Sequence, residues 1–134
     1  MIVVDATDLA DILIGKEVLQ SAAHALARED PDWISTGLWR YELGNVVWKE
    51  VRFQKGDRAN LKVALGSAES LLMETVEEVD RPAIWEIACD TGLTYYDASY
   101  VWLARSRGRK LRTRDKQILE TCPDVAMTMP DAAT

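Results

Sequence analysis

Histidine and cysteine are scarce in this sequence. The 134 residues include one histidine, His24, and two cysteines, Cys89 and Cys122, with no CxxC pair and no histidine near either cysteine. Without such spacing a zinc site is excluded, and a single histidine leaves little basis for a Ser/His/Asp or Cys/His mechanism. We expect both cysteines to be small buried thiols without a disulfide, and His24 to have no chemical role. Acid–base or metal chemistry in this chain would have to use carboxylates.

Long apolar runs are also missing. No stretch approaches the roughly 18 residues that a transmembrane helix needs. The first residues, MIVVDATDLAD, are acidic and lead directly into a strand-like segment, without the basic start and cleavage motif of a secretory signal. The 48% hydrophobic and 28% charged content is that of one globular domain spanning residues 1–134. We therefore expect a cytoplasmic protein that does not bind membranes.

The net charge of −6, from 16 basic and 22 acidic residues, argues on its own against binding to nucleic acid. The charge is unevenly distributed, however. The segment from Arg105 to Lys116 (RSRGRKLRTRDK) has seven basic residues and one acidic residue, a local charge of +6, so the rest of the chain carries −12. This segment is either a solvated helix end, where basic side chains are favourable, or a basic rim that holds a polyanion beside an acidic site.

Short apolar runs alternate with helical stretches along the whole chain, without repeats or linkers. The first run, IVVD at residues 2–5, ends in an acid, as in a parallel strand covered on both faces. Further strands are predicted at 33–36, 75–79, 110–113 and 125–129. Helices are predicted at 8–14, 16–27, 38–54, 57–73, 81–92, 97–108 and 115–120. These β-α units predict a three-layer α/β/α sandwich with a mostly parallel central sheet of four to five strands.

Acidic side chains fall where reactive groups collect in a parallel α/β sheet, at the carboxyl ends of strands. Asp5 ends the first predicted strand, Asp115 follows the fourth by two residues, and Asp97 opens a helix that faces the same edge. A fourth acid, Glu42, lies in the long helix, with Asn45 one turn later. Each acid alone is explained as a helix cap or turn residue. Together they would repel one another without a cation, and oxygen ligands favour Mg²⁺ or Mn²⁺.

The long helix at 38–54 is apolar around almost its whole circumference, apart from a polar stripe centred on Glu42. Its apolar residues are Leu38, Trp39, Tyr41, Leu43, Val46, Val47, Trp48, Val51 and Phe53. Packing on one face of a sheet requires fewer. The helix is therefore either buried between two neighbouring helices or used as a dimer or partner surface, and we favour the partner surface.

Four motifs resemble those of one family, in the same order along the chain. They are VVDAT at 3–7, YELGNVVW at 41–48, YYDASYVWLA at 95–104 and LRTRDKQIL at 111–119. Their spacing and the chain length are also similar. In these motifs the chain resembles a PIN domain, and specifically the short, stand-alone VapC-type toxins of prokaryotic toxin–antitoxin pairs.

This resemblance implies a toxin that is an Mg²⁺- or Mn²⁺-dependent endoribonuclease. The family's acidic quartet, which ligates the metal, corresponds to Asp5, Glu42, Asp97 and Asp115. Thr7 and Thr113 match family positions that hydrogen-bond to the carboxylates, and Asn45, one turn after Glu42, is expected to do the same. The expected mechanism is in-line attack on an RNA phosphodiester by water that the metal activates.

The basic residues Arg112, Arg114 and Lys116 flank Asp115 directly. Beside an acidic metal site, we interpret this run as a clamp for the RNA backbone. The resemblance further implies a homodimer and a cognate VapB-like antitoxin, which covers the apolar helices with an extended segment or a helix. Trp39 and Trp48 on the long helix are suitable anchors for such contacts.

Other classes fit less well. A receiver-like signalling domain would have paired acids after its first strand, whereas Asp5 has no acidic neighbour at that strand end. A phosphatase with a DxD nucleophile pair fails because Asp5-Ala6-Thr7 has threonine in place of the second aspartate. The alternative that stays open is a catalytically inactive PIN-like module that binds RNA or a protein partner.

Overall fold

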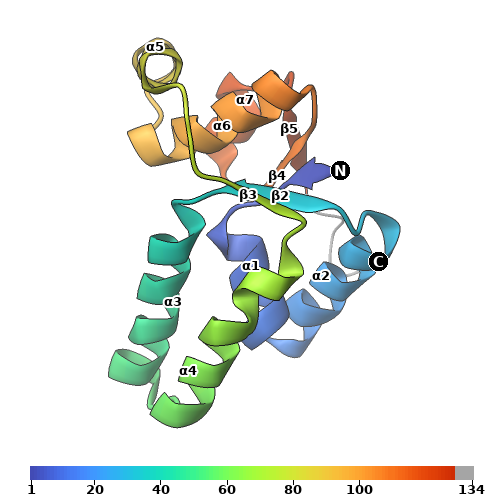
Figure 1. Ribbon diagram of the computed structural model, residues 1–134, viewed down its shortest axis with the longest axis vertical. Helices are drawn as coiled ribbons and strands as arrows, with labels where there is room; N and C mark the ends of the chain where they lie inside the picture. The colour runs from blue at the N-terminus through green and yellow to red at the C-terminus, as the bar shows by residue number, and fades with distance from the viewer. Residues whose placement is uncertain (129–134) are drawn as a thin grey trace.

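The computed structural model describes residues 1–128, in which a five-stranded sheet lies between two layers of helices (Figure 1). The strands are β1 (Ile2–Val3), β2 (Trp33–Thr36), β3 (Glu74–Val76), β4 (Leu111–Thr113) and β5 (Ala126–Thr128). Their order is β3-β2-β1-β4-β5, and every neighbouring pair is parallel. The predicted three-layer architecture is confirmed. The last residue of the strand predicted at 125–129, and residues 130–134 of the predicted domain, lie outside the described residues.

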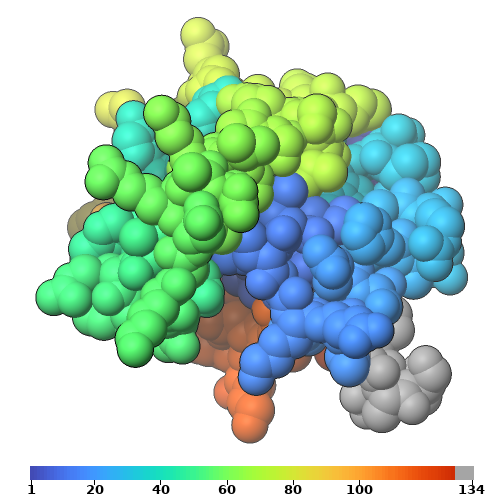
Figure 2. Space-filling model, turned by 90° about the horizontal axis from the view of Figure 1, so that it is seen from below, coloured from blue at the N-terminus to red at the C-terminus, as the bar shows by residue number. Residues whose placement is uncertain are grey.

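Helices cover both faces of the sheet. They are α1 (Ala6–Ile14), α2 (Glu17–Glu29), α3 (Trp39–Gln54), α4 (Arg58–Ser67), the 3-10 turn η1 (Ala68–Leu71), α5 (Arg81–Thr91), α6 (Tyr95–Arg107) and α7 (Lys116–Thr121). The first four lie on one side and the last three on the other (Figure 1), and Figure 2 shows the outer surface of the first layer. Within residues 1–128, no helix is long and apolar enough to cross a membrane.

The alternation of side chains along β1 divides the core in two. Ile2 and Val4 pack with Leu9 and Leu43 under α1 and α3, whereas Val3 packs on the opposite face, under α6 and α7. Successive residues of a strand point to opposite faces, so a strand covered on both sides must be apolar throughout. The short run IVV is therefore fixed as the central strand.

Several predicted elements are shorter in the structure, a helix and a strand most clearly. The helix predicted at 57–73 ends at Ser67 and continues as η1, and the strand predicted at 75–79 ends at Val76. The strand stops because its neighbour β2 ends at Thr36, which pairs with Val76, so later residues have no ladder to join. Cys122 is buried as expected, but Cys89 is exposed, because α5 packs against α6 and buries only Ile84 fully.

The long helix α3 is neither fully buried nor fully exposed. Trp39, Leu43 and Val47 face the core, whereas Trp48 and Phe53 are more than half exposed. The prediction that Trp39 anchors a partner is wrong, since its ring is buried and its Nε1 donates to Thr75 Oγ1 at 3.0 Å.

Candidate active site

The four predicted acids line one pocket of about 260 Å³ at the carboxyl edge of the sheet. β1 lies between β2 and β4, and the chain leaves β1 into α1 on one face and β4 into α7 on the other (Figure 1). A reversal of this kind opens a crevice at the strand ends, where ligands bind in doubly wound sheets. Asp5, Glu42, Asp97 and Asp115 come from four separate elements and meet there.

Two of the acids cap the helices that follow their strands. Oδ1 of Asp5 accepts a hydrogen bond from the Thr7 amide at 2.9 Å and begins α1. Oδ1 of Asp115 accepts from the Ile118 amide at 3.1 Å and begins α7. Each carboxylate therefore caps a helix and also lines the pocket.

The other two acids lie in the first turns of α3 and α6. The Tyr100 hydroxyl, one turn after Asp97, donates to Oε1 of Glu42 at 2.5 Å and ties the two helices together. All four acids thus sit at helix N-termini, where the helix dipole favours negative charge.

The carboxylates nevertheless repel one another. Burial raises the pKa of Asp5 to about 6, and the charge of Glu42 adds to the effect. Burial raises the pKa of Glu42, with a further contribution from the charge of Asp97, and raises that of Asp97, with a further contribution from Asp115. The helix termini do not neutralise the pocket, and it is therefore suited to a cation.

Removing one of these charges should stabilise the protein in metal-free buffer. The pKa of Asp5 is about 6 in the folded chain against an ordinary 3.8, so the native state binds its proton more tightly, and stability falls as the pH rises from about 4 to 6. Asparagine keeps the helix cap. We expect Asp5→Asn to raise the Tm at pH 7 but not at pH 4, measured by thermal unfolding across that range. Parallel Tm profiles for the two proteins would contradict this account.

The donor set fits a hard divalent ion. No three His, Cys, Asp or Glu side chains among residues 1–128 are arranged to ligate one metal ion directly. Mg²⁺ keeps several of its waters and is usually held by one or two carboxylates, so a site for such an ion does not require three carboxylates on one metal. The carboxylate oxygens are the ligand type that these ions prefer.

The residues predicted to support the carboxylates divide into two groups. Thr7 and Thr113 line the pocket, and Thr113 Oγ1 accepts from the Asp115 amide at 3.0 Å. Asn45 is exposed and does not line the pocket, so its predicted contact with the acids is absent from this arrangement. Tyr100 was not predicted, although its position three residues after Asp97 places it on the same helix face.

A buried charge network lies behind the pocket. Arg112 on β4 is fully buried, with its Nε 3.3 Å from Oδ1 of the buried Asp8. Arg114, which is partly exposed, pairs with Asp11 at 3.0 Å. Burial raises the pKa of Asp8, and the charge of Asp5 adds to this.

The prediction that Arg112 contacts RNA is therefore wrong for this arrangement. β4 is covered on both faces, so a basic residue within it is buried and needs an internal acid. Arg114 and Lys116 follow the strand and are exposed. The missed signal was the spacing of Asp8 and Asp11 at three-residue steps from Asp5, which places all three on one side of α1.

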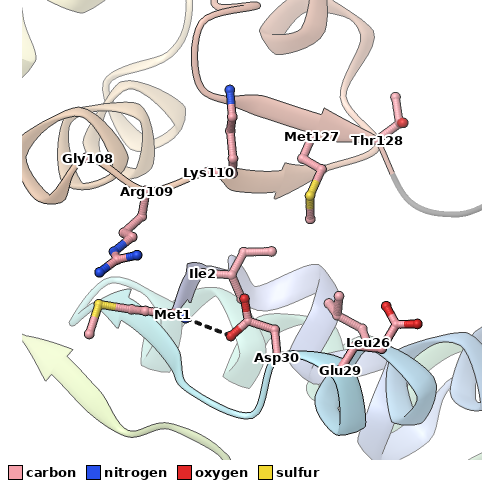
Figure 3. Close-up of a pocket in the computed structure, with 10 residues that line it drawn as sticks. All are labelled: Met1, Ile2, Leu26, Glu29, Asp30, Gly108, Arg109, Lys110, Met127 and Thr128. Atoms are coloured by element: carbon pink, nitrogen blue, oxygen red, sulfur yellow. Dashed lines mark ion pairs between the residues drawn. The ribbon is translucent and has the colours of Figure 1, made fainter.

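A separate cavity of about 460 Å³ opens near the amino ends of β1 and β4, away from the acids (Figure 3). It is lined by charges of both signs, two of which form an ion pair. The amino group of Met1 lies 2.9 Å from Asp30 Oδ1, and Lys110 Nζ donates to the Asp124 carbonyl at 2.7 Å. None of the predicted site residues lines it.

A wholly parallel sheet with four carboxylates at its switch point defines an α/β domain with an acidic pocket at the ends of its strands. The chain belongs to the PIN domain family, whose sequence profile matches residues 2–122.

Two curated relatives come from Pyrobaculum aerophilum. The chain is 38% identical to "Exonuclease VapC9" over 110 residues, which are 74% of this chain and 79% of that protein. It is 31% identical to "Ribonuclease VapC3" over 126 residues, 91% of this chain and 95% of that protein. The resemblance to VapC-type PIN domains is thus confirmed.

Solved structures agree. The crystal structure of PAE2754 from the same organism superimposes with a TM-score of 0.76 at 27% identity, covering 95% of this chain and 82% of that one. The structure of FitAcB from Neisseria gonorrhoeae gives a TM-score of 0.65 at 17% identity, covering 97% of both chains. The second likeness concerns the fold alone.

Proposed function

We propose that this chain is a VapC-type toxin that cleaves RNA internally with the help of Mg²⁺ or Mn²⁺. The proposal depends on one observation, the series of mutually repelling carboxylates in the pocket at the switch point. The names of the relatives, an exonuclease and a ribonuclease, support nuclease activity on the same fold.

The acidic quartet, Asp5, Glu42, Asp97 and Asp115, would hold the ion. When bound, such an ion lowers the pKa of water and offsets charge at the reacting phosphate. Tyr100 keeps its proton, since burial and then the charge of Glu42 raise its pKa, and it holds Glu42 in one orientation. Thr113 fixes the backbone of Asp115. Arg114 lines the pocket and Lys116 is exposed beside it, so both are placed to attract the RNA backbone.

The relatives' names do not distinguish cutting within an RNA chain from degradation that starts at an end. A circular RNA distinguishes these two activities. An exonuclease needs a free end, whereas an endonuclease does not. We expect purified chain to linearise a circular single-stranded RNA in Mg²⁺ or Mn²⁺ and not in excess chelator, as seen on a denaturing gel. Degradation of linear RNA alone would show that the chain acts from ends.

A protein that binds these RNAs but cuts none of them in either metal would be the inactive PIN-like module. The same gel therefore decides between the two candidate functions. A DNA circle of the same sequence is the control for substrate class, since only RNA offers a 2′-hydroxyl for recognition.

An antitoxin and a second copy of the chain are the proposed protein partners. The support is a set of exposed apolar side chains on α3 and α4, Val46, Trp48, Phe53 and Val63. The rings of Trp48 and Phe53 meet edge to face, with centroids 6.0 Å apart. Exposed aromatic pairs of this kind are typical anchors of protein interfaces.

A further inference from the structure

A second pocket adjoins the acidic one and has a different chemistry. It has a volume of about 370 Å³ and is lined by three tyrosines, Tyr41, Tyr95 and Tyr96, which we call the tyrosine pocket. We propose that the tyrosine pocket binds one unpaired base of the RNA, next to the phosphate held at the acidic pocket. This inference rests on the proposed nuclease function and names how the site would choose its substrate.

The two pockets are lined by neighbouring residues of the same two helices, α3 and α6. Tyr41 directly precedes Glu42 on α3, and Tyr96 directly precedes Asp97 on α6, so each tyrosine is one residue from an acid. Thr36 lines the tyrosine pocket and also influences the pKa of Tyr100, which lines the acidic pocket. Adjacent Cα atoms are about 3.8 Å apart, so a nucleotide with its phosphate at the acids can place its base among the tyrosines.

The rings are available to a ligand. Tyr41 is 81% exposed, Tyr96 60% and Tyr95 40%, and the Tyr95 hydroxyl donates to the Arg81 carbonyl at 3.3 Å. Unpaired RNA bases are recognised by stacking on aromatic side chains and by hydrogen bonds to their edges. The tyrosine pocket offers both kinds of contact.

A fixed polar pair completes the wall of the tyrosine pocket. The Arg40 guanidinium donates to Glu77 at 2.6 Å and to Glu69 at 2.5 Å. Arginine has five N–H donors, and these two bonds use one on Nε and one on Nη1, so three donors lie outside these bonds. A base edge carries donors and acceptors in a similar planar arrangement.

The tyrosine pocket is distinct from the apolar surface proposed for protein partners. Tyr41 and Phe53 are twelve residues apart on α3, roughly 18 Å along the helix axis. The pocket lies at the acid-bearing end of α3, while Trp48 and Phe53 lie toward the other end. Its position therefore favours RNA over a protein side chain as the occupant.

Binding of a short single-stranded RNA with 2-aminopurine at successive positions tests the proposal. Fluorescence is measured in Mg²⁺ immediately after mixing, before cleavage, with the intact chain and with Tyr41→Ala and Tyr96→Ala, so the readout does not depend on cleavage. We expect about 5- to 100-fold weaker binding and loss of quenching at one position. Tyr41→Phe and Tyr96→Phe should bind like the original chain, because they keep the ring. Trp85→Ala, which removes an equally exposed aromatic outside the pocket, should have no effect.

Unchanged RNA binding by both alanine variants, or equal weakening by Trp85→Ala, would overturn the proposal. So would a change of oligomeric state with RNA affinity unaltered, which would assign the pocket to a protein contact. Thermal unfolding of each variant confirms that it is folded. Tyrosine-dependent binding without cleavage in any metal would support the base site and reject the nuclease proposal alone.

Discussion

Replacing Asp97 with asparagine should reduce RNA cleavage by more than about 100-fold while the protein stays folded. Residues that merely support metal ligands cost about 10- to 100-fold when they are changed, and a ligand itself should cost more. Asp97 lies between Glu42 and Asp115 in the series of interacting charges, so neutralising it alters the centre of the cation site. Its backbone amide still donates to Thr94 Oγ1 in the variant, so α6 should begin as before.

Cleavage rates of the original chain and Asp97→Asn in Mg²⁺ and Mn²⁺ measure this effect. Asp90→Asn is the matched control, since Asp90 is an exposed acid on α5 outside the pocket. We expect the control to cut normally and Asp97→Asn to gain activity as Mn²⁺ is increased, because a weakened site is filled at higher metal concentration. Equal activity of Asp97→Asn and the original chain would remove Asp97 from the site.

The place of the acidic pocket was predictable because it depends on topology. A run of apolar residues that ends in Asp5 had to be a central strand, and parallel strands place their carboxyl ends at one edge. Asp97 followed from a helix start, and Glu42 from the polar stripe on the long helix. These inferences required only which residue ends which element, and short strands and cap residues mark those positions clearly.

The burial and the contacts of individual side chains were less predictable. Arg112 was interpreted by its charge and its neighbours in sequence, but the strand containing it is covered on both faces. Asn45 shares a helix face with Glu42, yet α3 carries it away from the sheet edge into solvent. Burial depends on contacts between distant segments, such as α1 against β4, and the periodicity within one segment does not contain that information.

Breaking the buried pair of Asp8 and Arg112 should markedly lower the stability of the protein. We expect Asp8→Asn to lower the free energy of unfolding by about 3–5 kcal/mol, since it removes the buried carboxylate that pairs with the buried Arg112 charge. Arg112→Met should cost less. Asp8 can take up a proton when its partner is gone, and its pKa is already raised by burial, whereas arginine stays charged.

Urea unfolding at two pH values distinguishes this asymmetry from a simple loss of packing. In Arg112→Met the remaining Asp8 is protonated at low pH and costly to ionise, so that variant should be closer to the original stability at pH 5 than at pH 8. Asp8→Asn should show no such recovery at pH 5, because the charge left behind is Arg112. The double variant should lose less stability than the sum of the two single losses.

Arg107→Met, which breaks the exposed pair with Glu74, should change stability little at either pH. Equal losses of stability in Asp8→Asn and Arg112→Met at both pH values would contradict this account. They would mean that packing around β4, and not the buried charge, determines the stability of this strand and of Asp115, which follows it.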